Sequence, residues 1–190
     1  MTTVYFIRHA QSDHNNQDEQ TRGLSEQGKK DVALVTHFLA DKKIDVAFSS
    51  PYQRAINTIA DYTEKYNIPI RSLEGFREWD RQRDHSVSVE KMYRRYWADF
   101  DYKFSNSESL REVQQRNIAT LGEVLSTCEG KNVIIGTHGM ALSTIINFYD
   151  PCFGYADFCR LLPIMPLAVK MTFEEKRCLD IEQIKLKNYT

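Results

Sequence analysis

Two arginines and two histidines stand close behind three apolar segments of the sequence. Arg8 and His9 follow TVYFI, Arg54 lies shortly after VAFSS, and His138 follows NVIIGT. A planar guanidinium group can hold two oxygens of an oxyanion such as phosphate, and a neutral imidazole can act as an acid, a base or a nucleophile. If the three segments lie side by side, we expect a dianion pocket in which Arg8 grips a phosphoryl group and His9 attacks it.

Each of these residues also has an ordinary structural interpretation. A single histidine near a strand end is often a hydrogen-bonded structural group, and most arginines are exposed. The four residues together favour the functional interpretation. We expect no metal, because the spacing of His9 and His14 matches no helical i, i+4 ligand pair and no carboxylate motif accompanies it. We expect no cofactor either, since the two guanidinium groups supply positive charge.

The elements that must position these groups alternate along the chain. Apolar, β-branched runs predict strands at 3–7, 46–50, 69–73, 167–173 and 179–186, with a strand, a turn and a helical stretch from residue 132 onward. Helical spacing predicts helices over about 25–41, 50–66, 88–100 and 109–127. Such alternation indicates an α/β fold, a three-layer α/β/α sandwich with a mainly parallel central sheet. Ligands of such sheets bind beyond the carboxyl ends of the strands.

Three serines are predicted to begin helices. Ser25 is a candidate N-cap, Ser50 can cap a helix with Pro51 in its first turn, and Ser109 with Glu112 matches a capping box. These positions set where each helix leaves the predicted sheet.

Composition and charge exclude several classes of protein. With 190 residues, 42% of them hydrophobic, the chain suits one domain over 1–190, and a net charge of -1 gives no general attraction to nucleic acid or to an anionic membrane. No apolar run is long enough to span a bilayer, and no export signal opens the sequence. The four cysteines form no paired motif, so a cytoplasmic location is expected. The oligomeric state stays open.

The segment at about 79–107 interrupts the alternation. It holds both tryptophans and interleaves arginines with aromatic residues, and it predicts a helix near 88–100. One interpretation is a small helical lid inserted into the domain, in which Arg81 and Arg83 contact the substrate. The alternative is an ordinary surface helix whose aromatic residues pack on the body of the protein.

Several short blocks resemble one known family when they are taken in order. They are RHA at 8–10, Asn15, LSEQG at 24–28, SSPYQRAINT at 49–58, FRE at 76–78, ES at 108–109 and THG at 137–139. This ordered set, covering roughly residues 3–150, resembles the histidine phosphatase superfamily, the phosphoglycerate-mutase-like proteins. The resemblance implies the phosphoglycerate-mutase-like fold.

The resemblance also implies roles for individual residues. His9 is the expected phosphate-accepting nucleophile, and Arg8, Arg54 and His138 form the expected phosphate pocket. Asn15 stands where the family places a phosphate-binding asparagine, and Glu78 stands where many members carry the proton donor. Ala10 replaces the usual glycine, and WDRQRD replaces a glycine-rich continuation after Glu78, which leaves the choice of substrate open.

Three functions are compatible with this resemblance. A phosphatase passes the phosphoryl group from His9 to water, a phosphoglycerate mutase passes it to a retained hydroxyl, and a non-catalytic member only binds phosphate. The resembling mutases are longer and use further segments to exclude water. We therefore expect a metal-independent phosphatase that acts on a small phosphorylated metabolite.

Overall fold

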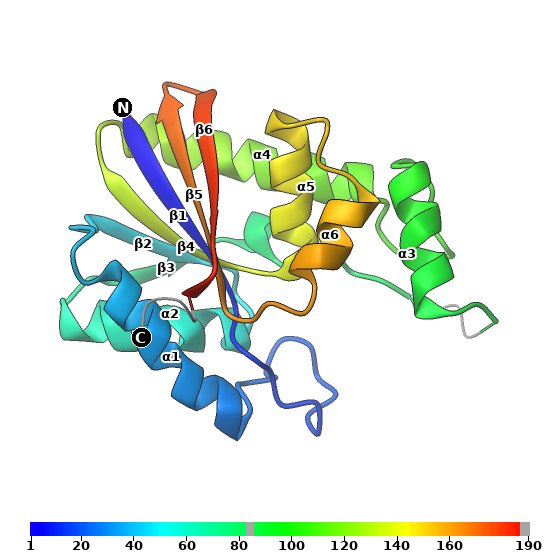
Figure 1. Cartoon of the computed structure of the whole chain (residues 1–190), viewed down its shortest axis with the longest axis horizontal. Helices are drawn as coiled ribbons and strands as arrows, with labels where there is room; N and C mark the ends of the chain where they lie inside the picture. Colours follow the sequence, from blue (N-terminus) through cyan, green and yellow to red (C-terminus); the bar gives the residue numbers. More distant parts are fainter. Residues whose placement is uncertain (83–85, 187–190) are drawn as a thin grey trace.

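A six-stranded sheet forms the centre of the computed structural model, which describes residues 1–82 and 86–186 (Figure 1). The strand order is β3-β2-β4-β1-β5-β6. The strands are β1 (Thr2–Arg8), β2 (Val46–Ser49), β3 (Ile70–Ser72), β4 (Asn132–Thr137), β5 (Leu167–Glu174) and β6 (Arg177–Ile184). Neighbours from β3 to β1 run parallel, whereas β5 pairs antiparallel with β1 and β6 with β5. The predicted α/β class with a mainly parallel sheet is confirmed.

Helices cover both faces of this sheet (Figure 1). Those of the described residues are α1 (Glu26–Leu39), α2 (Gln53–Lys65), α3 (Val89–Ala98), α4 (Leu110–Thr127), α5 (Gly139–Tyr149) and α6 (Tyr155–Leu161), with a short 3-10 turn η1 (Glu74–Phe76). Helices α1 and α2 lie against one face, and α4 and α5 lie against the other. The sequence patterns indicated neither η1 nor α6.

Strand β1 shows why the sheet is buried on both sides. Successive side chains of a strand point to opposite faces. Val4 and Phe6 pack with the cluster under α4 and α5, and Tyr5 and Ile7 pack with the cluster under α1 and α2. A continuous apolar run is therefore what this central strand requires.

Two of the three predicted helix starts are correct. The Ser25 hydroxyl accepts a hydrogen bond from the Gly28 N–H (3.1 Å), and Ser109 with Glu112 forms the predicted capping box of α4. The prediction for Ser50 was wrong. Helix α2 begins at Gln53 after Tyr52, because residues 50–52 form a turn in which Ser50 accepts a hydrogen bond from the Tyr52 N–H (3.2 Å).

The segment after Glu78 packs through its aromatic residues. The rings of Trp79 and Tyr96 have centroids 4.5 Å apart, and those of Tyr93 and Phe158 lie 5.1 Å apart. Helix α3 therefore rests on α6 at the end of the molecule that Figure 1 shows on the right. That this segment closes over a site as a lid stays a prediction.

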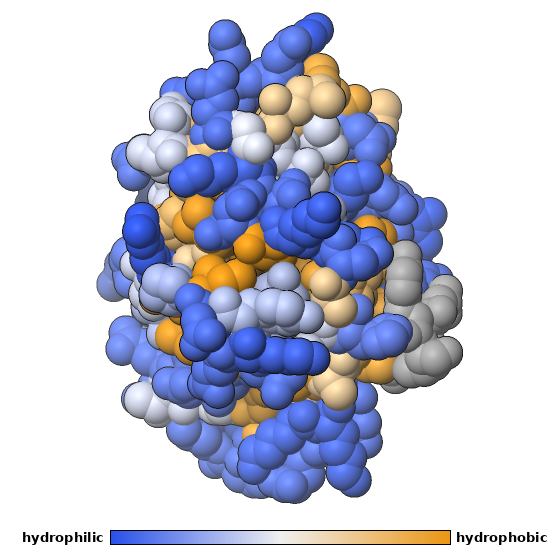
Figure 2. All heavy atoms as spheres, turned by 90° about the vertical axis from the view of Figure 1, so that its left-hand side faces the viewer, coloured by the Kyte–Doolittle hydropathy of each residue, from blue (hydrophilic) through white to orange (hydrophobic). Residues whose placement is uncertain are grey.

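Hydrophilic side chains dominate the face of the molecule that Figure 2 shows. On the face shown in Figure 2, they cover most of the area, and hydrophobic atoms emerge only in small patches between them. Among the described residues, no helix combines the length and the apolar character that crossing a membrane requires.

A partly buried ion cluster fixes the segment that carries Glu78. The Glu108 carboxylate accepts hydrogen bonds from Arg77 (2.7 and 2.8 Å) and from Arg116 (2.9 and 3.0 Å). Arg116 also donates to the backbone carbonyls of Gly75 (2.9 Å), Arg77 (2.8 Å) and Glu78 (3.1 Å). Burial alone would raise the pKa of Glu108, but hydrogen bonds from Arg116 and Arg77 lower it to about 2. Helix α4 thereby holds the backbone on both sides of Glu78.

We predict that Glu108→Gln destabilises the protein in a pH-dependent way. Removing the carboxylate that these two partly buried guanidinium groups share costs about 2 kcal/mol of unfolding free energy at pH 7. Because the folded-state pKa of Glu108 is lowered from 4.5 to about 2, its contribution is complete above about pH 4.5 and is lost as the pH falls toward 2. Urea unfolding of both proteins at pH 7, 4.5 and 3 measures the difference.

Glu123→Gln is the control, since Glu123 is exposed on α4, the helix that carries Arg116. It should leave the unfolding free energy nearly unchanged at every pH. A Glu108→Gln protein as stable as the wild type at pH 7, or one equally weakened at pH 7 and pH 3, contradicts the role given to the ion cluster.

Candidate active site

The carboxyl ends of β1, β2 and β4 bring the predicted residues together. Arg8 lies opposite Thr137 in the parallel register of β1 and β4, and Ser49 of β2 lies opposite Gly136. The His9 N–H donates to the Thr137 carbonyl at 3.0 Å, so His9 and His138 leave neighbouring strands at the same level. Their rings lie edge to face with centroids 5.3 Å apart.

His9 is held as a neutral imidazole with one free nitrogen. Its Nδ1 lies 2.7 Å from the Ala10 carbonyl oxygen, which can only accept, so Nδ1 carries the proton and Nε2 holds the lone pair. Burial, followed by the charges of Arg54 and Arg8, lowers the pKa of His9 well below its ordinary value of 6.5. The ring is therefore uncharged at neutral pH, as a nucleophile must be.

His138 is completely buried beside His9. Its Nε2 lies 2.7 Å from the Ser50 hydroxyl, and its Nδ1 has no hydrogen-bond partner among the residues described. Burial and the charge of Arg54 lower the pKa of His138 well below 6.5. His138 packs against the ring of Tyr52 as well, with centroids 5.2 Å apart, and it is not among the residues that line the pocket described below.

The Arg8 guanidinium is positioned by the end of α6. Its Nη1 donates to the carbonyls of Leu161 (2.8 Å), Leu162 (2.9 Å) and Ile164 (3.2 Å). Its Nε is buried and has no partner in the described part of the chain. Gly139 permits this placement, because a Cβ at that position would lie 3.3 Å from three Arg8 side-chain atoms.

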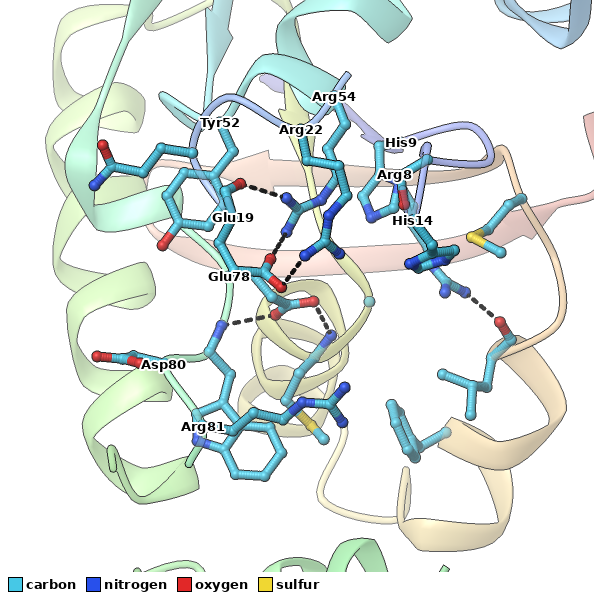
Figure 3. A pocket seen from close by; sticks show the side chains of 18 of the residues that line it. Arg8, His9, His14, Glu19, Arg22, Tyr52, Arg54, Glu78, Asp80 and Arg81 are labelled. Carbon is cyan, nitrogen blue, oxygen red and sulfur yellow. Dashed lines mark hydrogen bonds and ion pairs between the residues drawn. The ribbon is translucent and has the colours of Figure 1, made fainter. Parts of the chain in front are cut away.

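Arg54, in the first turn of α2, is paired with a carboxylate from the loop after β1. Its Nη1 donates to the Glu19 carbonyl (2.7 Å), and its Nη2 lies 3.0 Å from Glu19 Oε2. The other oxygen, Oε1, lies 2.5 Å from Nη2 of Arg22. In Figure 3 the Glu19 carboxylate lies between the two guanidinium groups.

Glu78 is oriented by the first turn of α5. One oxygen accepts from the Ala141 N–H (3.0 Å) and from the N–H of Trp79 (2.9 Å), and the other accepts from the Met140 N–H (3.2 Å). These backbone donors hold the carboxyl group at the edge of the pocket (Figure 3). The positive end of the α5 dipole lies at the same place.

A pocket of about 590 Å³ lies beside these groups. Of the predicted site residues, it is lined by Arg8, His9, Arg54, Glu78 and Arg81.

Two predicted site residues, Asn15 and His138, are not among the residues that line the pocket. Asn15 is exposed and does not line the pocket; its backbone N–H donates to Asp13 (3.0 Å). Arg83 lies outside the described residues.

Several residues of the site were not found by sequence reasoning. Glu19, Arg22 and Tyr52 line the pocket, and Arg116 holds the backbone at Glu78. Glu19 and Arg22 lie in a polar loop where charged residues are common, so their types alone gave no signal. Arg116 lies on a helix face, where a partner such as Glu108 can be recognised only in three dimensions.

Curated relatives of this chain are phosphatases by name. It is 27% identical to "Uncharacterized phosphatase PhoE" of Bacillus subtilis over 151 residues. The matched region covers 77% of this chain and 76% of that protein. It is 28% identical over 150 residues to "Phosphoserine phosphatase 1" of Hydrogenobacter thermophilus, covering 73% of this chain and 71% of that protein.

A solved structure has the same fold over nearly the whole length. It is a phosphoserine phosphatase mutant from Entamoeba histolytica in complex with phosphoserine, with a TM-score of 0.79 and 17% identity, covering 98% of each chain.

The family model for the histidine phosphatase superfamily (branch 1) matches residues 4–150. This range begins in β1, ends after α5, and contains the four residues at the strand ends together with Glu78. It agrees with the resemblance that the sequence motifs indicated. The chain therefore belongs to the histidine phosphatase superfamily (branch 1).

Proposed function

We propose that this protein is a phosphatase that hydrolyses small phosphomonoesters through a phosphohistidine on His9. The observation that carries the proposal is the state of His9. Its neutral ring has Nδ1 fixed on the Ala10 carbonyl and the lone pair on Nε2, and two buried arginines line the same pocket. Membership of a phosphatase family supports the reaction class.

In the first step His9 Nε2 attacks phosphorus, and the bond from phosphorus to the ester oxygen breaks. Arg8 and Arg54 balance the negative charge of the equatorial oxygens. The family resemblance implies that His138 also contacts the phosphoryl oxygens, which as a neutral imidazole it would do as a hydrogen-bond donor. The guanidinium groups supply the positive charge in this scheme, so we expect turnover to continue in EDTA.

Glu78 serves as the proton donor and then as the base. Its carboxyl group protonates the departing ester oxygen, and it later takes a proton from the water that attacks the phosphohistidine. Backbone N–H groups of α5 and the hydrogen bond from Arg116 to the Glu78 carbonyl fix the position of this carboxyl group. This fixed geometry supports assigning the role to Glu78.

Hydrolysis is favoured over mutase chemistry. Only about 30 residues separate Glu78 from Glu108, which leaves little chain for the water-excluding segments of the longer mutases. The matching curated relatives also carry phosphatase names. A phosphoglycerate mutase activity is the alternative outcome of the experiment below.

A panel of phosphorylated metabolites tests the proposal. Phosphoserine, 3-phosphoglycerate, sugar phosphates and an aryl phosphate are each assayed for release of inorganic phosphate, with kcat/KM determined for every hit. We expect phosphate release without a bisphosphate primer and with EDTA present. Isomerisation of 3-phosphoglycerate that needs a bisphosphate primer would instead identify a mutase, and absence of both reactions would identify a binding protein.

We predict that His9→Ala lowers kcat at least about 1,000-fold, because it removes the covalent route while the fold persists. Stopping the reaction with substrate labelled in the phosphoryl group should trap an acid-labile phosphoenzyme in the wild type and none in the variant. His37→Ala is the control, since His37 is exposed on α1 outside the pocket. Near-normal turnover by a folded His9→Ala protein would exclude the mechanism.

We predict that the effect of Glu78→Gln depends on the leaving group. A sugar phosphate needs a proton on its departing oxygen and should lose about 100-fold or more in kcat, whereas an aryl phosphate should lose much less. Steady-state kinetics on the two substrates measure this.

Asp80→Asn is the control for the acid role, because Asp80 is exposed and lines the same pocket. It should slow both substrates alike or not at all. If Asp80→Asn shows the selective loss and Glu78→Gln does not, Asp80 is the acid.

A further inference from the structure

We propose that Arg22 is a further ligand of the phosphoryl group, and that the Glu19 carboxylate is an internal anion which the phosphoryl group displaces. This inference rests on the proposed function, because it assumes that the pocket around His9 receives phosphate.

The first argument is the occupation of Arg54. Its two terminal nitrogens both contact Glu19: Nη1 contacts the backbone carbonyl at 2.7 Å and Nη2 contacts the carboxylate at 3.0 Å. A phosphoryl oxygen bound by Nη2 takes the place of the carboxylate oxygen. Phosphate binding by Arg54 through this nitrogen therefore requires an exchange of anions.

The second argument is the geometry of the carboxylate. One oxygen of Glu19 contacts Arg54 and the other contacts Arg22 at 2.5 Å, so two guanidinium groups share a single oxyanion. Paired oxygens of phosphate suit guanidinium nitrogens in the same way as those of a carboxylate. An anion that replaces the Glu19 carboxylate thus meets both arginines.

The third argument is the contrast in burial between the cations and the anion. The side chains of Arg22 and Arg54 are 12% and 4% exposed, whereas that of Glu19 is 57% exposed. Arg22 is also held by a hydrogen bond from its Nε to the Asn16 carbonyl (2.9 Å). The arginines form the fixed part of the site, whereas the Glu19 side chain, more than half of which is exposed, can turn into water when the phosphoryl group replaces its carboxylate as the anion beside both cations.

The loop itself need not open for this exchange. The Gln20 carbonyl accepts from the Gln53 N–H at 2.9 Å, and the Asp18 carboxylate accepts from the N–H groups of Gln20 (2.8 Å) and Thr21 (2.9 Å). With its backbone held on both sides, Glu19 can leave by rotation of its side chain. Its carbonyl then keeps Arg54 in place through Nη1.

Binding of inorganic phosphate tests both parts of the proposal. Isothermal titration calorimetry, at fixed ionic strength, compares the wild type with Glu19→Gln, Arg22→Ala and the double variant. Glu19→Gln removes the competing charge and should bind phosphate about 5-fold more tightly, as expected when an ion pair worth about 1 kcal/mol no longer opposes binding. Glu174→Gln is the control: Glu174 pairs with Arg177 at the β5–β6 turn, and its side chain is similarly exposed at 58%.

The double variant shows whether Arg22 contacts phosphate itself or only positions the Glu19 side chain. If Arg22 contacts phosphate, adding Arg22→Ala to Glu19→Gln should weaken phosphate binding about 10-fold, the loss of one charge-assisted hydrogen bond. Arg22→Lys in the same background keeps the charge and should fall between the two, and thermal melts verify folding. Unchanged affinity on adding either Arg22 substitution overturns the role of Arg22.

The role of Glu19 is overturned if Glu19→Gln binds phosphate no more tightly than the wild type and Glu174→Gln. None of these measurements requires turnover. A protein that binds phosphate as expected but hydrolyses no substrate would therefore refute the proposed function and leave this inference standing. An active phosphatase whose Glu19→Gln variant binds phosphate no more tightly would support the proposed function and refute the displacement of Glu19.

Discussion

The burial of two positive charges in one pocket is the constraint on which the rest of the site depends. Arg8 and Arg54 are 6% and 3% exposed, and arginine stays protonated even where burial lowers its pKa. Each guanidinium group needs acceptors, and a further positive charge on a buried imidazole between them would be costly. The neutral state of His9 and His138 follows, because burial and these charges disfavour the imidazolium form.

The two arginines satisfy this requirement by different means. Arg8 donates to three backbone carbonyl oxygens at and just beyond the end of α6. Because these acceptors belong to the backbone, they stay in place as long as the protein is folded. Arg54 receives a carboxylate from an exposed side chain of the loop after β1. Permanent backbone acceptors keep Arg8 in position, whereas the partner of Arg54 is one that another anion can replace. The side of the pocket at Arg8 is therefore rigid, whereas the side at Arg54 can exchange its anion.

The carboxyl group of Glu78 depends on a separate set of contacts. Helix α5 contributes N–H donors to its oxygens, and Arg116 of α4 holds its backbone carbonyl. Helices α4 and α5 pack against each other and against the same face of the sheet. Strand register therefore places His9, the proposed nucleophile, on one side of the pocket, and helix packing places Glu78, the proposed acid, on the other.

The sequence by itself determined the α/β class, most helix starts and the candidate residues at the strand ends. Those signals are local: apolar runs mark buried strands, and serine or a capping box marks a helix start. The proposed acid role of Glu78 was indicated only by the resemblance to a family, since a lone glutamate in a polar segment has no distinguishing pattern.

Only the tertiary structure decided which side chains meet. Arg8 contacts Leu161 across 153 positions, Ser50 meets His138 across 88, and Arg116 reaches the Gly75 carbonyl across 41. It also decided the antiparallel pairing of β5 and β6, the start of α2, and the pairing of Glu19 with Arg54. Such contacts depend on strand order and on the path of each loop, and local periodicity carries no information about either.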